Sequence, residues 1–159
     1  MIEERLERLG FHLPKPASPS FQYVPVVRHD DLLFVSGQLP KVDGKVKVFG
    51  KVGREVTIEE AQDQARICIL QGLSCIKQEI GSLDNISRIV KITGYVNSAP
   101  GFVEQPKVID AASELLEAVF KEKGRHARAA IGAAELPRNT CVEIEMIVAC
   151  RKEGPSWEK

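Results

Sequence analysis

The sequence predicts an α+β fold in which two helices cover one face of a mixed β-sheet, and three observations lead to it. Two long segments, residues 57–80 and residues 106–124, carry apolar residues at helical spacing. Each of them is followed by a stretch of β-branched residues that is typical of a strand. Two strand-like stretches also precede the first helix. The resulting order, ββ-α-β-α-ββ, suggests two related halves that lay both helices on one side of the sheet.

A short amphipathic helix and a connector precede this pattern. Apolar side chains recur at helical spacing within residues 1–10, at Ile2, Leu6 and Leu9. Three prolines between residues 12 and 20 indicate an extended connector. We therefore expect the helix and connector over residues 1–20, the main domain over residues 21–152 and a tail over residues 153–159.

The main domain opens with two expected strands, residues 21–28 and residues 32–36, on either side of a polar turn. Glycines within residues 41–56 then indicate a loop with short hairpin strands. The later strands are expected at residues 87–97, 127–134 and 141–151.

The first long helix has clear signals at both ends. Thr57 and Glu60 have the spacing of a capping box, in which the threonine oxygen accepts from first-turn amides and the glutamate reaches back. Gly81 ends the helix. Small residues along one side permit a close approach to the sheet, and they are Ala61, Ala65, Cys68, Gly72 and Cys75.

The second long helix begins at residue 106 or 107 and ends at Gly124. With both helices on one face, the other face of the sheet has no cover within a single chain. Leaving apolar surface in water is unfavourable. We therefore predict an oligomer in which the sheets of separate copies pack against one another.

Charge and hydropathy argue against several classes of partner. The chain has 22 basic and 22 acidic residues and no block of like charge, so no basic patch for nucleic acid is indicated. The apolar runs are short and interrupted, so neither a membrane-spanning segment nor a membrane partner is expected. The charged N-terminus is unlike a signal peptide. We expect a cytoplasmic protein.

The cysteines fit that compartment as free thiols. None of the four forms a CxxC pair, and the three histidines lie far from them, so metal-ligand spacing is absent. We expect no metal and no other cofactor. Cys68 and Cys75 are seven residues apart in the first long helix and are interpreted as small core residues.

The strongest functional signal lies near the C-terminus, in two strands joined by a short Pro/Asn turn, as in a hairpin. The first strand carries Arg128 and the second carries Glu143. A guanidinium makes two parallel charge-assisted bonds to a carboxylate, and a nearby glutamate can hold a water or move a proton. The pattern indicates a site for a small carboxylate.

Three motifs resemble those of the RidA/YjgF family of reactive-intermediate imine deaminases, also labelled endoribonuclease L-PSP. The resemblance runs from Tyr23 to Cys150. Its motifs are Leu33-Phe-Val-Ser36-Gly37-Gln38-Leu-Pro40, then Ala127-Arg128 with Leu136-Pro137, and then Val142-Glu143-Ile-Glu145. It implies a chorismate mutase-like fold, a homotrimer with a central β-barrel, helices outside and sites between subunits. The uncovered sheet face agrees with that assembly.

By position, the resemblance implies that Arg128 binds the substrate carboxylate and that Glu143 orients the attacking water. It also implies further pocket residues, which are Tyr23, Ser36, Gly37 and, where the family usually has an asparagine, Ser113. The chain departs from the family at Ala129 and Ala130, where Ser-Cys is common. It therefore resembles a divergent subgroup with a less polar pocket.

The implied activity is hydrolysis of small 2-imino acids, such as 2-iminopropanoate and 2-iminobutanoate, to 2-oxo acids and ammonia. A protonated C=N carbon is already electrophilic, so fixing the carboxylate and delivering one water is sufficient without a cofactor. Two alternatives stay open. One is a non-catalytic trimeric module or sensor that binds small carboxylates. The other is an endoribonuclease, which the balanced charge disfavours.

Each candidate side chain also has a plain structural interpretation. Arg128 could pair with Glu143 or Glu145, and these two acids could line an ordinary solvated face of their strand. Tyr23 could be a strand aromatic. His126 matches no family role and is interpreted as a surface histidine.

Overall fold

The computed structural model describes residues 1–16, 18 and 22–151 of the 159-residue chain. Parts of three expectations therefore lie outside the described residues: the last part of the connector, the start of the first strand at Phe21, and the domain end at Lys152 with the tail that follows. Within the described part, the helices and strands follow the predicted order ββ-α-β-α-ββ after a short N-terminal helix.

Five strands form one mixed sheet, and they are β1 (Val26–His29), β2 (Leu32–Gln38), β5 (Ile86–Asn97), β6 (Ala127–Ala133) and β7 (Val142–Cys150). Their spatial order is β1-β2-β7-β5-β6. Only β5 and β6 run parallel, and the other pairs are antiparallel. A separate small hairpin consists of β3 (Lys41–Val42) and β4 (Lys45–Val46).

Two strand predictions are wrong in detail. The first strand begins at Val26 because Pro25, directly before it, has no amide hydrogen for the ladder. The strands that carry Arg128 and Glu143 do not form a hairpin, since β5 lies between them. The helix before β6 returns the chain to a position parallel to β5, and β7 then pairs with the opposite edge of β5.

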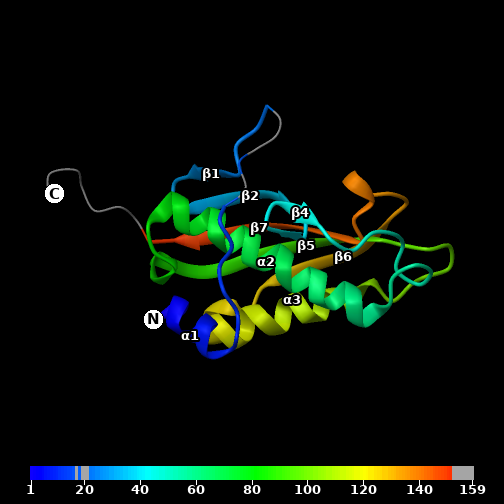
Figure 1. Ribbon diagram of the computed structural model, residues 1–159. Coiled ribbons are helices and arrows are strands. Elements are labelled where there is room, and N and C mark those ends of the chain that lie inside the picture. The colour runs from blue at the N-terminus through cyan, green and yellow to red at the C-terminus, as the bar shows by residue number, and fades with distance from the viewer. Residues whose placement is uncertain (17, 19–21, 152–159) are drawn as a thin grey trace, which may run out of the picture.

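The two long helices, α2 (Ile58–Ile80) and α3 (Gln105–Phe120), lie side by side over one face of the sheet (Figure 1). Both hydrogen bonds of the predicted capping box are present, 3.1 Å from Glu60 N to Thr57 Oγ1 and 2.8 Å from Thr57 N to Glu60 Oε2. Gly81 ends α2 with a φ of 80°. Both predicted ends of this helix are therefore confirmed.

The helix α3 ends earlier than predicted. A 3₁₀ turn, η2 (Lys121–Gly124), follows Phe120, and Lys121 has a φ of 57°. A Cβ on Gly124 would lie 2.3 Å from the carbonyl oxygen of Leu116. The prediction that Gly124 ends this helix is therefore wrong, and the missing side chain of Gly124 instead lets the turn fold back against α3.

The short helix α1 (Ile2–Arg8) packs beside α3 (Figure 1). Leu6 is buried, and the Arg5 guanidinium donates to the carbonyl oxygen of Val119 near the end of α3. Leu9 lies after the helix and is 45% exposed, so its predicted place in the apolar stripe is wrong.

The two faces of the central strand β7 differ sharply. Alternate residues are buried beneath the helices, and they are Val142, Ile144, Met146, Val148 and Cys150. A Cβ on Gly72 of α2 would lie 2.9 Å from Met146 Sδ, and one on Gly94 of β5 would lie 2.4 Å from Ile109 Cδ1. The predicted close approach between small residues of the helices and the sheet is confirmed at Gly72.

Among the described residues, no further layer covers the opposite face of the sheet. Val27, Phe34 and Ile147 stand in one row across β1, β2 and β7. Val27 is 51% exposed and Phe34 is 42% exposed. The predicted α+β fold with one uncovered sheet face is therefore confirmed, whereas the packing of that face against another copy stays a prediction.

Candidate functional site

Arg128 lies on the edge strand β6, opposite Ile92 of β5, and its side chain reaches α3 on the covered face. Its Nη1 donates to Asp110 Oδ1 at 2.8 Å and to Ser113 Oγ at 3.2 Å. Its Nη2 makes a long contact of 3.5 Å with the carbonyl oxygen of Pro106. The guanidinium is therefore held by acceptors from one helix.

The ion-pair partner of Arg128 is Asp110, so the alternative pairing with Glu143 or Glu145 is wrong. The side chains of Arg128 and Asp110 are 25% and 51% exposed. Pairs of this kind contribute only about 0–1 kcal/mol to stability, because water competes for both charges. The Arg128–Asp110 pair therefore orients the guanidinium more than it stabilises the fold.

His126 joins the same group. Its Nε2 lies 2.9 Å from Ser113 Oγ, and its Nδ1 lies 2.6 Å from the carbonyl oxygen of Gly124. Both ring nitrogens therefore have partners in a half-buried side chain. The interpretation of His126 as an ordinary surface histidine is wrong. We call Arg128, Asp110, Ser113 and His126 the arginine cluster.

Glu143 lies on β7 opposite Tyr95 of β5 and faces the uncovered side of the sheet. Its carboxylate is half-buried and has no hydrogen-bond or ion-pair partner among the described residues. Burial, and then the charge of Glu145, raises the pKa of Glu143 above the ordinary value of a glutamate. Glu145 instead accepts a hydrogen bond of 2.8 Å from the Tyr95 hydroxyl, which raises the pKa of Tyr95.

Gly37 lies directly against Glu143. A Cβ at this position would come within 2.7 Å of Glu143 Oε1. The register of β2 against β7 shifts between Val35 and Gln38, and this irregularity brings the backbone of Gly37 toward the carboxylate. Glycine is therefore required here for the observed position of Glu143.

Ser36 and Tyr23 belong to the same region of the chain. The Ser36 hydroxyl donates to the carbonyl oxygen of Val24 at 2.8 Å, and the Ser36 amide donates to that of Pro25 at 2.9 Å. The segment that carries Tyr23 therefore runs beside Ser36, and Tyr23 itself is 50% exposed. We call Glu143, Gly37 and Ser36 the glutamate cluster.

The structure thus brings the six predicted site residues into two groups rather than one. The arginine cluster contains Arg128 and Ser113, and the glutamate cluster with nearby Tyr23 contains the others. The Cα atoms of Arg128 and Glu143 are separated by two strand spacings and three residues along β5, which is roughly 14 Å. Their side chains lie on opposite faces, so one chain does not bring them together.

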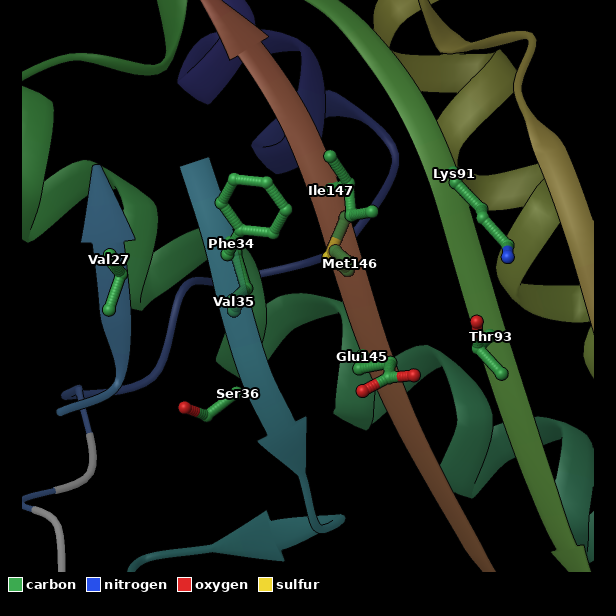
Figure 2. A pocket seen from close by; sticks show the side chains of 9 residues that line it. All are labelled: Val27, Phe34, Val35, Ser36, Lys91, Thr93, Glu145, Met146 and Ile147. Atoms are coloured by element: carbon green, nitrogen blue, oxygen red, sulfur yellow. The ribbon is translucent and has the colours of Figure 1, made fainter. Parts of the chain in front are cut away.

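A hollow of about 330 Å³ opens on the uncovered face. Figure 2 shows Phe34 and Ile147 at its apolar end, and the Glu145 carboxylate between Ser36 of β2 and Thr93 of β5. Lys91 supplies one positive charge at its rim. Of the six predicted site residues, only Ser36 lines this hollow.

Sequence reasoning missed Asp110 and gave no role to His126. A usable signal existed for both. Asp110 precedes Ser113 by three residues, which places the two on one face of a helix. His126 precedes Arg128 by two residues, which places the two on one side of an extended chain. These spacings pair the residues within each element, but they do not show that the helix and the strand bring the two pairs together.

The described residues contain no group of three or more His, Cys, Asp or Glu side chains that could hold a metal ion. The four cysteines are buried and free, and burial raises the pKa of Cys141 to about 12. The burial of Cys68 and Cys75 confirms their predicted place in the core. None of the described helices combines the length and the apolar character needed to cross a membrane.

Comparisons with known proteins agree with this architecture. A family model described as "YjgF/chorismate_mutase-like, putative endoribonuclease" matches residues 3–149. Protein TCP17 of Trypanosoma cruzi is 43% identical over 148 residues, which cover 92% of this chain and 92% of that protein.

Two solved structures are similar over nearly their full length. Atu1372 of Agrobacterium tumefaciens is 48% identical with a TM-score of 0.89, over 94% of this chain and 92% of that one. A Shewanella oneidensis structure named "putative endoribonuclease" is 31% identical with a TM-score of 0.90, over 94% and 99% of the two chains. With the family match, these similarities show that the chain belongs to the RidA/YjgF family and has its chorismate mutase-like fold.

Proposed function

We propose that the chain is a hydrolytic deaminase that converts small 2-imino acids to 2-oxo acids and ammonia in clefts between the subunits of a homotrimer. The observation that carries the proposal is the contrast between a preformed arginine cluster and a half-buried, unpartnered Glu143. One group suits an anionic ligand, and the other suits a water.

Arg128 is the carboxylate-binding group of this proposal. Its guanidinium is one-quarter exposed and is fixed on one side by α3, so a ligand can reach the other side. A planar guanidinium forms two parallel charge-assisted bonds to a carboxylate, which a lysine cannot reproduce. Ala129 and Ala130, next to Arg128, leave room for a small ligand and add no competing charge.

Glu143 is the water-orienting group. Its raised pKa makes the ionised carboxylate a stronger base than an exposed glutamate. In the proposed step, Glu143 takes a proton from water as the water oxygen bonds to the iminium carbon. The proton then passes to the nitrogen. The C–N bond breaks and ammonia leaves as the hydroxyl oxygen forms the C=O bond and gives its proton back to Glu143. One water is consumed, and no electron is transferred.

A homotrimer explains how the two clusters meet. They lie on opposite faces of the sheet within one chain, so a cleft that uses both needs two copies. We assign Arg128 and Ser113 to one wall of the cleft, and the glutamate cluster with Tyr23 of a neighbouring subunit to the other. Burial of the apolar row Val27, Phe34 and Ile147, of which Val27 and Phe34 are exposed, would favour association.

A coupled assay tests the activity. A dehydratase generates 2-iminopropanoate or 2-iminobutanoate, and release of the 2-oxo acid is followed with wild-type protein and with Arg128→Ala. We expect acceleration by the wild type and its loss in the variant. If the wild type accelerates neither imine, the deaminase proposal is wrong for these substrates.

The second candidate is a trimeric module that binds small carboxylates without turning them over. It is favoured by Ala129 and Ala130, which supply no polar group beside Arg128. Titration of the wild type with 2-oxobutanoate separates the two functions, since binding without hydrolysis supports the module. Incubation with RNA in the same buffers tests the activity that some relatives' names carry.

A further inference from the structure

We propose that Asp110, Ser113 and His126 are positioning residues that hold the Arg128 guanidinium in one orientation and leave one of its edges for a ligand carboxylate. This role rests on the proposed function, in which Arg128 binds the substrate carboxylate. Asp110 and His126 thereby gain a role that no sequence motif indicated. Ser113 changes from a wall of the pocket to an anchor of the arginine.

The chemistry of the partners fixes the direction of each hydrogen bond. A guanidinium only donates and a backbone carbonyl only accepts. The Gly124 oxygen therefore receives its hydrogen from His126 Nδ1, which leaves Nε2 of the neutral imidazole as an acceptor. Ser113 Oγ receives a hydrogen from Arg128 Nη1 and points its own hydrogen at His126 Nε2. The hydrogen bonds therefore run in one direction, from Arg128 through Ser113 and His126 to the carbonyl oxygen of Gly124.

The acceptors on α3 all engage the same end of the guanidinium. Pro106, Asp110 and Ser113 are spaced at i, i+4 and i+7, which places them on one face of the helix. Asp110 and Ser113 take the two hydrogens of Arg128 Nη1, and Pro106 faces Nη2. The end of the arginine that carries Nη1 and Nη2 therefore faces α3.

The opposite edge of the guanidinium is left for a ligand. It carries the Nε hydrogen and one Nη2 hydrogen, which run parallel. Among the described residues, Arg128 Nε donates no hydrogen bond. Two parallel donors match the two oxygens of a carboxylate. The arginine cluster therefore prepares Arg128 for a bidentate ligand before the ligand arrives.

The network is not needed to keep α3 in place. Asp110 is half-exposed, whereas the neighbouring Val108, Ile109 and Ala112 are fully buried and attach the helix to the sheet. Removing the Asp110 carboxylate therefore leaves the packing of α3 intact. Its effect should appear in ligand binding rather than in the thermal midpoint.

Steady-state kinetics with 2-iminobutanoate test the anchoring role. We expect Asp110→Ala to raise KM about tenfold and to leave kcat within about threefold, because a hydrogen bond to a charged group is lost. Asp110→Asn keeps an acceptor oxygen and should stay within about threefold of the wild-type KM. Ser113→Thr should likewise retain the KM that Ser113→Ala loses. Glu117→Ala, an exposed carboxylate on α3, controls for the change in charge.

Two kinetic outcomes would overturn the proposal. If Asp110→Ala binds the substrate as tightly as the wild type or more tightly, Asp110 competes with the ligand instead of anchoring the arginine. If it lowers kcat and the thermal midpoint together, the role of Asp110 is structural.

Nitrogen NMR of the histidine rings tests the network independently of any activity. The His126 resonances, assigned with His126→Phe, should show a proton on Nδ1 and none on Nε2, and Ser113→Ala should perturb Nε2. A proton on Nε2 in the wild type at neutral pH would overturn the proposed direction of these hydrogen bonds. A wild type with the Nδ1 proton but no binding of 2-oxobutanoate would retain the network and contradict the proposed function.

Discussion

The arginine cluster and the glutamate cluster differ in how their charges are satisfied. Arg128 has three acceptors from its own chain, whereas the Glu143 carboxylate has no partner among the described residues. Burial disfavours the ionised form of a carboxylate that lacks partners, and the raised pKa of Glu143 expresses that cost. One half of the proposed cleft is therefore complete within a subunit, while the other half requires a neighbour or a ligand.

The largest expected effect is the loss of either charge. Arg128→Ala and Glu143→Gln should each lower kcat/KM by about 10²–10⁴-fold, since one removes the carboxylate partner and the other the base. If the two clusters meet across subunits, a refolded equimolar mixture of the variants should regain activity, because about a quarter of its clefts carry both native residues. The imine hydrolysis assay on each variant and on the mixture measures this. A mixture no more active than its components would place both residues in one subunit's site.

A charge on the uncovered face should dissociate the oligomer. Phe34→Glu places a carboxylate in the exposed apolar row, where burial of an unpaired charge is costly. We expect a shift from trimer to monomer by light scattering after gel filtration, together with loss of imine hydrolysis. Val103→Glu changes a residue that is 78% exposed and lies outside the sheet, so it should leave the mass unchanged. A wild type that elutes as a monomer would contradict the trimeric cleft.

Two glycines on opposite faces of the sheet should respond to alanine in different ways. Gly37→Ala pushes against the flexible end of Glu143, so we expect about a tenfold loss of kcat/KM with a thermal midpoint close to that of the wild type. Gly94→Ala pushes against buried Ile109 in the core and should cost about 1–3 kcal/mol of stability. Activity assays measure kcat/KM of both variants, and urea unfolding measures their free energies of unfolding. Equal loss of stability in the two would show that Gly37 serves packing as well.

The smallest expected effects concern pH. Since the pKa of Glu143 is raised by burial and then by Glu145, kcat/KM should fall as the pH drops through that raised value. Glu145→Gln removes one cause, so the acid limb of the pH profile should move to lower pH. An acid limb that does not respond to Glu145→Gln would mean that another group controls it.

The raised pKa of Glu143 also makes the free energy of unfolding depend on pH. A carboxyl group whose pKa is higher in the folded than in the unfolded state favours folding at low pH, and this contribution is lost as the pH rises through the folded value. Glu143→Gln has no such dependence. Its free energy of unfolding relative to the wild type should therefore increase from acidic to neutral pH, as urea titrations at several pH values would show.

Much of the fold followed from local signals, because these depend on a few neighbouring residues. The capping box at Thr57 and Glu60 and the glycine at position 81 define α2 without any knowledge of the sheet. The buried residues of β7 likewise alternate with its two acids, Glu143 and Glu145, as the sequence pattern indicates. The order of strands was less accessible, since insertion of β5 between β6 and β7 depends on a crossover through α3.

The candidate site residues came from the sequence motifs, whereas their arrangement is visible only in the folded chain. The motifs pointed to Arg128 and Glu143. Their spacing does not predict that the two side chains lie on opposite faces of the sheet. The pairing of Arg128 with Asp110 depends on how α3 sits against β6, which is set by packing rather than by local sequence. The missing partner of Glu143 could not be read from a pattern either, because it is a property of the folded surroundings.

The position of α1 constrains the order in which the chain folds. Ile2 donates its amide to Asp84, and Arg5 donates to Val119, so the first helix is attached to residues 82 and 114 positions away. Closing such long loops costs conformational entropy, which the contacts must offset. During synthesis the N-terminal segment emerges before any of its partners. Leu6 therefore has no native surface to bury against until α3 has been made, which leaves docking of this helix as a late step in folding.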